Sequence, residues 1–406
     1  MKKMKRSLSF IAGLVLVLGL VFNQANTTFA AINESQPSLS EVTNLAKETA
    51  SYVLSEDSAL LTSVTSNSEF RTISRDLILA NETGLDVTNQ ISTFLETAKT
   101  LFSESVLLNP ASNTTAYYTA NYAELIELIN IIGQDASNFN GINLYTTLND
   151  ALKNMTVANL SDSNNLNPYL ISELHTCLIS YSANFTDYET INANLNAALK
   201  AITDENGVNY WGYSADNDGN TLSGFSSVVK TDSEFNSIID AIVAKHTSTT
   251  ATSDGTVYTD PDTGAVYAWG DLNPDSTALS LAFLSEYGDS TAAAVKYNAL
   301  VENFKSTTTG AFTYYGSDSI YSSRDALIGL VAYLTYGNLT DSTNETVTET
   351  QNNTQAEVLA DSTALNSETT DSTVPTADNS CVNVFAILMA ASALALAVTA
   401  KTKKTN

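Results

Sequence analysis

Three short aromatic segments bracketed by glycines recur in the second half of the chain, and they constrain its fold more than any other feature. They read Gly207-Val208-Asn209-Tyr210-Trp211-Gly212, Gly264-Ala265-Val266-Tyr267-Ala268-Trp269-Gly270 and Gly310-Ala311-Phe312-Thr313-Tyr314-Tyr315-Gly316. Glycine adopts the backbone conformations that turns require, so each segment predicts a turn, a short extended stretch and a second turn. Their spacing of roughly 50 residues indicates a repeated structural unit.

Strongly apolar helices accompany these segments. Residues 278–284 (ALSLAFL) and 326–334 (ALIGLVAYL) are apolar on nearly every side, and residues 170–181 show the same pattern more weakly. The dipeptides Asn167-Pro168 and Asn273-Pro274 mark the starts of two such helices, because Pro suits the first turn of a helix. A helix that is apolar on every side must be buried on every side.

Other helical segments have one apolar face. Ser38-Leu39-Ser40-Glu41 is a capping box that precedes the first of them. Apolar residues at helical spacing predict helices with one solvent-exposed side over residues 42–53, 91–102, 122–129, 144–152, 191–202, 235–242 and 297–304. This alternation predicts an all-α domain over residues 34–337, with an inner ring of helices wrapped by an outer ring. We expect about six helix pairs, with the least regular pattern at residues 56–85.

The two clearest repeats are TGAVYAWGDLNPDSTALSLAFLSEYG and TGAFTYYGSDSIYSSRDALIGLVAYLTYG. They resemble the repeat of the prenyltransferase and squalene-cyclase class, over a region from Asn167 to Gly337. The resemblance implies an α/α toroid of six helix pairs. Relatives in that class include cobalamin-carrier and complement thioester domains, so the resemblance also makes cobalamin a candidate bound ligand. Because this architecture hosts unrelated chemistries, it does not specify the function.

The catalytic signatures of that class are missing from the sequence. Protein prenyltransferases hold zinc through Asp, Cys and His, but His175 and Cys177 point to different sides of a predicted helix, which favours core or groove positions. The chain contains no Cys-Gly-Glu-Gln thioester sequence. We therefore predict no catalytic residue, no metal site and no cofactor other than cobalamin as a ligand, and we favour a protein that is not an enzyme.

Two acidic strings approach the Asp-x-Asp-Asp motif of squalene cyclases. They are Asp216-Asn217-Asp218-Gly219 and Asp260-Pro261-Asp262-Thr263, and both lack the final Asp. Asp, Asn and Gly favour turns for backbone reasons, so we predict a polar turn at each string. The first string also fails as a calcium loop, because Phe225 occupies the position that needs a bidentate acid.

Acidic residues dominate the charge of the chain. Its 406 residues include 44 Asp and Glu against 18 Lys and Arg, a formal net charge of −26. Several of the cations lie at the two extreme ends, so the middle of the chain is more acidic still. This charge argues against nucleic-acid binding and against docking on anionic lipid, because both need a basic surface.

Both ends carry features of export and anchoring. Residues 1–30 have a basic start, an apolar run and a cleavage context of small residues at Ala30, which predict a signal peptide. Residues 338–380 are acidic and rich in Ser, Thr and Asn, which predicts a disordered stalk. Residues 381–406 combine an apolar anchor helix with a basic tail. We expect an exported protein on the outer cell surface.

The order of stalk, Pro-Thr motif, apolar helix and basic tail resembles the cell-wall sorting signal that sortases of Gram-positive bacteria recognise. The motif region reads Thr373-Val374-Pro375-Thr376-Ala377-Asp378-Asn379-Ser380, with Ala377 where the family has Gly. The resemblance implies that Thr376 is joined to peptidoglycan and that Cys381 is discarded with the helix. A simple membrane anchor is the alternative, and both arrangements make the cell envelope a partner.

The loops that enter the inner helices of a toroid gather at one mouth of the barrel, where we expect a ligand. Aromatic faces flanked by carboxylates suit a sugar or a flat cofactor. The candidate ligand-binding residues are Tyr210, Trp211, Trp269, Asp271, Asp275, Tyr314, Tyr315, Asp318, Arg324 and Asp325. The alternative is structural, because repeated aromatic residues often fill the spaces between neighbouring repeats. Arg324 is expected in a buried or rim ion pair.

Three functions compete. The first is a non-catalytic surface module for binding or adhesion, which captures an extracellular glycan, peptide or small cofactor. The second is a glycan-active hydrolase or lyase, which needs two carboxyl groups about 5–10 Å apart. It therefore requires Asp271, Asp275, Asp318 and Asp325 to converge. The third is a ligand-free spacer whose acidic surface resists aggregation.

Overall fold

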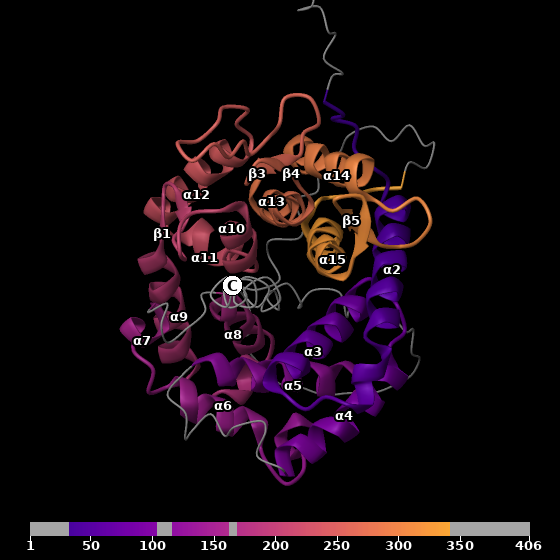
Figure 1. The fold of residues 1–406 in the computed structure, drawn as a ribbon. Helices are drawn as coiled ribbons and strands as arrows, with labels where there is room; N and C mark the ends of the chain where they lie inside the picture. The colour runs from indigo at the N-terminus through magenta and orange to yellow at the C-terminus, as the bar shows by residue number, and fades with distance from the viewer. Residues whose placement is uncertain (1–31, 104–115, 162–168, 342–406) are drawn as a thin grey trace, which may run out of the picture.

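The computed structural model describes residues 32–103, 116–161 and 169–341 (Figure 1). This part of the chain is predominantly helical, which confirms the predicted all-α class, and its strands form three short antiparallel hairpins. The predicted signal peptide (1–30), the anchor (381–406) and the stalk beyond residue 341 lie outside the described residues. Within those three ranges, no helix has both the length and the apolar content needed to cross a membrane.

The elements follow the labels of Figure 1. The helices are α2 (Leu39–Glu56), α3 (Asn67–Glu82), α4 (Thr88–Ser103), α5 (Ala116–Ile131), α6 (Leu144–Leu152), α7 (Val157–Ser161), α8 (Tyr169–Ser180), α9 (Tyr188–Ile202), α10 (Ala215–Thr221), α11 (Ser226–Thr231), α12 (Ser233–His246), α13 (Pro274–Tyr287), α14 (Ser290–Phe304) and α15 (Ile320–Tyr336). The hairpins pair β1 (Thr203–Asp204) with β2 (Gly207–Val208), β3 (Val266–Ala268) with β4 (Asp271–Asn273), and β5 (Phe312–Tyr314) with β6 (Ser317–Ser319).

Six of these helices are buried on nearly every side, namely α3, α5, α8, α10, α13 and α15. Each packs against the next one along the chain, and α15 also contacts α3, so the contacts close on themselves (Figure 1). Helices α2, α4, α6, α9, α12 and α14 bury one face each and lie outside this set (Figure 1). Along the chain, a one-sided helix therefore precedes every buried helix.

Sequence patterns located several helix starts correctly. Ser38 and Glu41 form the predicted capping box at the start of α2. Helix α13 begins at Pro274, as predicted, and the side chain of Asn273 caps it by accepting a hydrogen bond from the Ser276 N–H at 2.9 Å. His175 and Cys177 are buried in α8, which confirms their predicted core positions.

Two predictions about the buried helices were wrong. The stripe at residues 122–129 was assigned one wet side, but it belongs to α5 and is buried almost all round. The string Asp216-Asn217-Asp218-Gly219, predicted as a polar turn, lies in α10. The Ser214 side chain caps this helix, and tertiary contacts engage Asp216, Asn217 and Asp218, so they override the turn preference of the sequence.

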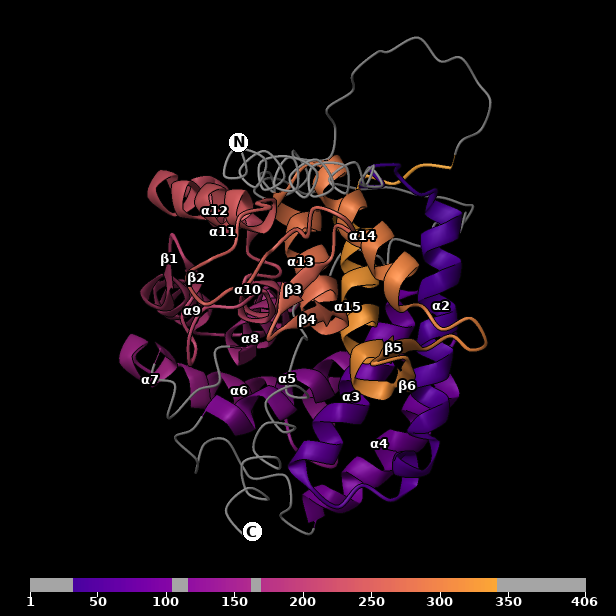
Figure 2. The ribbon, with the colours of Figure 1, turned by 45° about the horizontal axis from the view of Figure 1, so that its top comes forward.

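Glycines set the close spacing of α10, α13 and α15. A Cβ atom added to Gly219 of α10 would lie 2.2 Å from the carbonyl oxygen of Leu279 in α13. A Cβ atom added to Gly329 of α15 would lie 2.5 Å from the carbonyl oxygen of Ala278 on the same helix. Helix α13 is therefore held closely between α10 and α15 by two glycine contacts. Figure 2 shows β3 and β4 beside α13, and β5 and β6 beside α15.

Candidate functional site

Two of the repeated aromatic segments form hairpins ahead of a buried helix. Trp269-Gly270 joins β3 to β4, and Tyr315-Gly316 joins β5 to β6. Both residues of each loop have positive φ, with values of 54° and 94° in the first and 50° and 76° in the second, which identifies type I′ turns. In the remaining segment, Trp211 and Gly212 also have positive φ, at 54° and 115°. The three aromatic residues therefore share a positive φ, although Trp211-Gly212 does not join two strands.

An equivalent contact fixes each hairpin to the helix that follows it. The N–H of Val266 in β3 donates to Thr277 Oγ1 of α13 at 2.9 Å. The N–H of Phe312 in β5 donates to Ser323 Oγ of α15 at 2.9 Å. Both hydroxyls lie in the first turns of their helices. Each hairpin is therefore held at the N-terminal end of its helix.

At α10, the side chain that accepts the hydrogen bond from the preceding strand is the acid Asp218 instead of a hydroxyl group. The N–H of Val208 in β2 donates to Asp218 Oδ1 at 2.7 Å. The amide nitrogen of Asn217 donates to the carbonyls of Tyr210 and Gly212 at 3.1 and 2.8 Å. These bonds hold the first aromatic segment over the start of α10. All three segments thus gather at the same ends of three helices that pack side by side.

Trp211, Trp269 and Tyr315, which we call the aromatic tips, are 77, 75 and 76 % exposed. A bulky residue at positive φ is strained, whereas Asn or Gly would build the same turn without that strain. Strained residues that are not needed for packing are typical of functional sites. The structural interpretation of these aromatics as fillers between repeats is therefore wrong for the three tips.

Tyr210 and Tyr314 directly precede two of the aromatic tips and pack against them. Tyr210 is buried, and its ring stacks on Trp211 with centroids 4.7 Å apart and an interplanar angle of 18°. The ring of Tyr169 in α8 contacts the ring of Tyr210 edge-on, with centroids 5.4 Å apart. Tyr314 is half-buried, with its ring 4.3 Å from that of Tyr315. These tyrosines do have the packing role that the structural interpretation gave them.

Three carboxylates lie at the same helix ends, and we call Asp216, Asp275 and Asp325 the acidic cluster. Asp216 and Asp275 are the second residues of α10 and α13, and Asp325 lies in the second turn of α15. Asp216 accepts a hydrogen bond from Ser276 Oγ at 2.6 Å, which ties α10 to α13. Asp275 Oδ1 is buried and has no hydrogen-bonding partner among the described residues.

Burial raises the pKa values of all three carboxylates. Burial raises the pKa of Asp216 to about 6, and the nearby Asp275 adds to the increase. Burial also raises the pKa of Asp275. The pKa of Asp325 lies well above its usual range, first because of burial and then because of repulsion from Asp275 and Asp216.

Two arginines, Arg75 and Arg324, lie near Asp325 and partly offset the rise in its pKa. Arg324 Nε donates to Asp76 Oδ2 at 3.0 Å, and its Nη2 binds Asp57. This confirms the expected ion pair of Arg324, with partners from the start of the described chain. Arg75 of α3 lies in the field of Glu173 and Asp76. Deeper between the helices, the buried Arg71 binds Glu173 at 2.6 Å.

The structure brings some of the sequence-predicted residues together and separates others. Asp275 and Asp325 join the acidic cluster. Asp271 and Asp318 are exposed on β4 and β6 and do not join it. Asp318 accepts from Thr309 Oγ1 at 2.8 Å, and Asp271 bonds the adjacent N–H of Leu272. The predicted processing residues lie outside the described residues, and they are Ala30, Thr376 and Ala377.

Sequence reasoning missed Asp216, because its string suggested a turn. The signal that could have identified it is Ser214, which has the residue type and the spacing of a helix cap. With α10 recognised as a helix, Asp216 occupies the same position in its helix as Asp275 does in α13.

A buried Ser–His–Asp constellation was also missed. His246 Nε2 lies 3.0 Å from Asp218 Oδ2, and its Nδ1 lies 2.8 Å from Ser280 Oγ. Because the carboxylate can only accept, we assign the proton to Nε2 and let Nδ1 accept from the serine hydroxyl. All three residues are fully buried, and burial lowers the pKa of His246 to about 4. A substrate carbonyl cannot reach this serine, so the constellation links α10, α12 and α13 structurally.

We expect Ser280→Ala to lower the free energy of unfolding by about 1 kcal/mol, the usual net value of one hydrogen bond. We also expect a fluorophosphonate probe to leave Ser280 of the native chain unlabelled. Mass spectrometry of the treated protein and urea denaturation of the variant measure the two outcomes. Labelling of Ser280 under native conditions would contradict the structural role.

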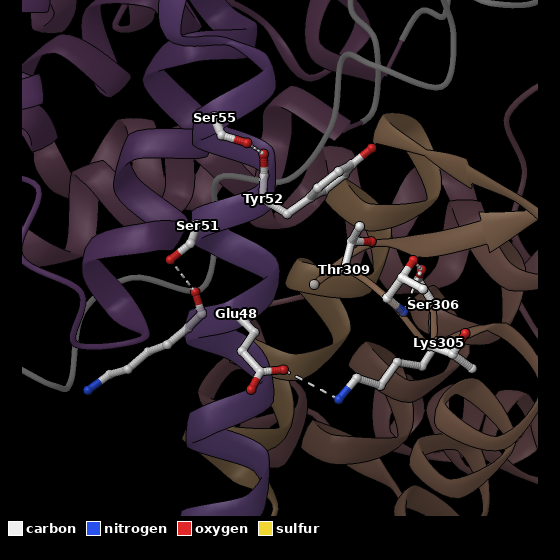
Figure 3. A pocket seen from close by; sticks show the side chains of 11 residues that line it. Glu48, Ser51, Tyr52, Ser55, Lys305, Ser306 and Thr309 are labelled. Carbon is white, nitrogen blue, oxygen red and sulfur yellow. Dashed lines mark hydrogen bonds and ion pairs between the residues drawn. The ribbon is translucent and has the colours of Figure 1, made fainter.

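Two surface grooves lie apart from the acidic cluster. The first, of about 720 Å³, runs between α2 and residues 305–310 (Figure 3). Figure 3 shows Lys305 reaching across it toward Glu48, with Nζ and Oε2 3.4 Å apart. The second, of about 580 Å³, is lined mainly by threonines next to α4. Neither groove is lined by an aromatic tip or by the acidic cluster.

Among the described residues, no group of three or more His, Cys, Asp or Glu side chains has an arrangement that could hold a metal ion. Comparisons of the chain with protein-family models, with curated proteins and with solved structures find no match.

Proposed function

We propose that residues 34–337 form an α/α toroid of six helix pairs that binds an extracellular glycan at one mouth. Two observations support the toroid: the contacts among the six buried helices close on themselves, and a one-sided helix precedes each of them. In this arrangement the binding mouth is the N-terminal end of α10, α13 and α15. The aromatic tips and the acidic cluster occur there together.

The observation that carries the binding function is the shared geometry of the aromatic tips. Trp211, Trp269 and Tyr315 adopt the same strained backbone conformation, and each is about three-quarters exposed. An aromatic face offers an apolar surface to the C–H face of a sugar, while nearby carboxylates accept hydrogen bonds from its hydroxyl groups. A ligand-free spacer has no use for three exposed aromatic residues held under strain, so this geometry favours binding.

The proposed location follows from the sequence of the two ends. A signal peptide at residues 1–30 exports the chain, and residues 338–406 supply a stalk and an anchor on the outer cell surface. The linkage at Thr376 to peptidoglycan and a simple membrane anchor both keep the glycan-binding mouth outside the cell. The acidic charge of the chain suits ligands other than nucleic acid.

A glycan-active enzyme is the second candidate, and one observation favours it. Asp216 and Asp275 are neighbouring carboxyl groups, and burial raises the pKa of both, which suits the role of a general acid. Against it, Asp271 and Asp318 are exposed outside the cluster, so the convergence that the sequence interpretation required is only partial. Release of reducing ends from any glycan that binds distinguishes an enzyme from a binding module.

A turn substitution tests the binding function without risking the fold. We expect Trp269→Asn to bind glycans about tenfold more weakly, a loss of about 1.4 kcal/mol, because one aromatic face is removed. The same change is expected to keep or increase stability, since Asn-Gly is the preferred pair for a type I′ turn. Glycan-array screening of the full chain identifies a ligand, and calorimetry then compares the proteins.

Trp269→Phe is the matched control, because it retains an aromatic face at the same position. We expect it to bind within about threefold of the parent chain, a difference of less than 1 kcal/mol. Absence of any glycan ligand for the parent chain, or unchanged affinity in Trp269→Asn, would overturn the proposed function.

A further inference from the structure

Exposed apolar side chains concentrate at the N-terminal ends of α10, α13 and α15. Seven large apolar side chains are exposed in the described part of the chain, and five of them are aromatic residues at or just before these helix starts. They are the three aromatic tips, Tyr213 beside the cap of α10 and Tyr321 in the first turn of α15. Exposed apolar residues that gather in one place mark an interaction site.

Each aromatic tip is attached to its helix through the same arrangement. In every case a backbone N–H of the segment donates to the side chain of the fourth residue of the helix, and the tip follows the donor by three residues. The donors and acceptors are Val208 with Asp218, Val266 with Thr277, and Phe312 with Ser323. Together with the shared positive φ, this arrangement gives each tip an equivalent position relative to its own helix.

The three helices that carry the tips lie side by side in the order α10, α13, α15 (Figure 1). Their backbones approach closely at Gly219 and Gly329, and the hydrogen bond from Ser276 Oγ to Asp216 joins the first turns of α13 and α10 at 2.6 Å. The axes of packed helices are about 8–10 Å apart. Because the tips are attached equivalently, they repeat with about this spacing, and Trp269 lies between the other two.

A row of equivalent aromatic platforms suits a ligand that itself repeats. A linear polysaccharide presents the same ring face at regular intervals, and a β-linked pyranose with equatorial substituents has an apolar C–H face that stacks on an aromatic ring. Each tip is about three-quarters exposed, so the platforms are open, whereas a site that recognises one chain end encloses it in a pocket. The row therefore favours the interior of a chain over its end.

Carboxylates next to the tips select against anionic sugars. Asp271 and Asp318 are exposed and lie within three residues of the nearest tip along the chain. Carboxylates accept hydrogen bonds from sugar hydroxyl groups but repel uronic acids and sulfated or phosphorylated sugars. Arg324 of α15 is paired with Asp57 and Asp76, so it does not reverse this preference. The net charge of −26 acts in the same direction.

We propose that Trp211, Trp269 and Tyr315 form one binding track for the interior of a neutral, linear β-linked polysaccharide, with Trp269 at its centre. This inference rests on the proposed function and specifies its ligand class and its mode of binding. Each tip stacks on one pyranose ring of the same chain, and the exposed carboxylates accept hydrogen bonds from its hydroxyl groups. Both ends of the polysaccharide extend beyond the track.

The test measures how affinity depends on ligand length. The probes are dimers, tetramers and hexamers of β-1,4-linked glucose and of β-1,4-linked N-acetylglucosamine, titrated into the full chain by calorimetry. In at least one series we expect the hexamer to bind about a hundredfold more tightly than the dimer, since each further tip that it reaches adds about tenfold. Reducing the end sugar of the hexamer is expected to change its affinity by less than about threefold, and a hexamer of uronic acid is expected to bind at least tenfold more weakly.

The double variant Trp211→Asn/Tyr315→Asn removes the two outer platforms. Asn tolerates positive φ, so both turns are expected to remain folded. We expect this variant to bind the dimer within about threefold of the parent chain, because the central platform remains, and to bind the hexamer no more than about threefold more tightly than the dimer.

Ile179→Thr is the matched control, because Ile179 is an exposed apolar residue near the C-terminal end of α8 and lies away from the tips. It is expected to keep the length dependence within about twofold. An affinity that does not rise with length, a rise that survives in the double variant, a large loss on reducing the end sugar, or a preference for the uronic acid hexamer overturns the track.

Binding of other glycans with no binding of either oligomer series also overturns the track. All of these outcomes leave the proposed glycan binding intact. If no glycan of any kind binds, the proposed function fails as well.

Discussion

Replacing Arg324 with methionine is expected to lower the free energy of unfolding by about 3–5 kcal/mol. Arg324 lies on α15, the last described helix, and joins it to Asp57 and Asp76 near the start of the described chain. All three residues are buried. Methionine fills similar space but leaves two acids buried without their cation. Burial already raises the pKa of Asp76 well above its usual range even with Arg324 present, so the variant is expected to take up a proton there.

Lys305→Met is the matched control for this prediction. Lys305 also joins distant parts of the chain, through its pair with Glu48 at 3.4 Å. The side chains of this pair are 34 and 57 % exposed, so water screens the interaction and the expected loss is at most about 1 kcal/mol. Urea denaturation of the three proteins measures both effects. Equal stability of the two variants would show that Arg324 does not hold the ends of the helix set together.

Replacing Glu127 with glutamine is expected to change how stability depends on pH. Glu127 of α5 is buried and accepts a hydrogen bond from the Tyr181 hydroxyl, while its Oε1 has no partner among the described residues. Burial raises its pKa to about 7, although the Tyr181 hydrogen bond opposes the shift. Between pH 4.5 and 7 the folded chain therefore holds a proton that the unfolded chain has released. The stability contributed by this proton is lost as the pH rises through 7.

Glutamine keeps the shape and the acceptor but does not titrate. Relative to the parent chain, the free energy of unfolding of Glu127→Gln is therefore expected to increase between pH 4.5 and 7, by on the order of 3 kcal/mol. Denaturation at pH 4.5, 6 and 8 measures the change. Glu205→Gln, an exposed acid in the turn between β1 and β2, serves as the control and is expected to give a constant difference. A constant difference for Glu127→Gln would contradict the raised pKa.

The one-sided helices could be predicted from the sequence because each has its apolar stripe next to a polar face. The capping box at Ser38 and the proline at Pro274 also marked helix starts correctly. Helix α10 was not recognised, because its polar sequence ADNDGNT has the composition of a turn. Its carboxylates Asp216 and Asp218 bind β2, α12 and α13, and none of those contacts is visible in the local pattern.

The sequence likewise predicted some features of the candidate site and not others. The glycine-bracketed repeats identified the aromatic tips, because a local motif determines a local turn. They did not show which aromatic residue of each segment would be exposed. Nor did they distinguish Asp275 and Asp325 from the exposed Asp271 and Asp318, since four acids in similar loops have similar sequence surroundings.

By itself the sequence determined the helical class, the positions of the one-sided helices and the turns that present an aromatic residue, because these features depend on spacing within a few residues. Only the tertiary structure decided that Asp216, Asp275 and Asp325 meet, and that Arg324 reaches back to Asp57 and Asp76. Those contacts join residues far apart in the chain, and a local sequence pattern carries no information about how distant helices pack.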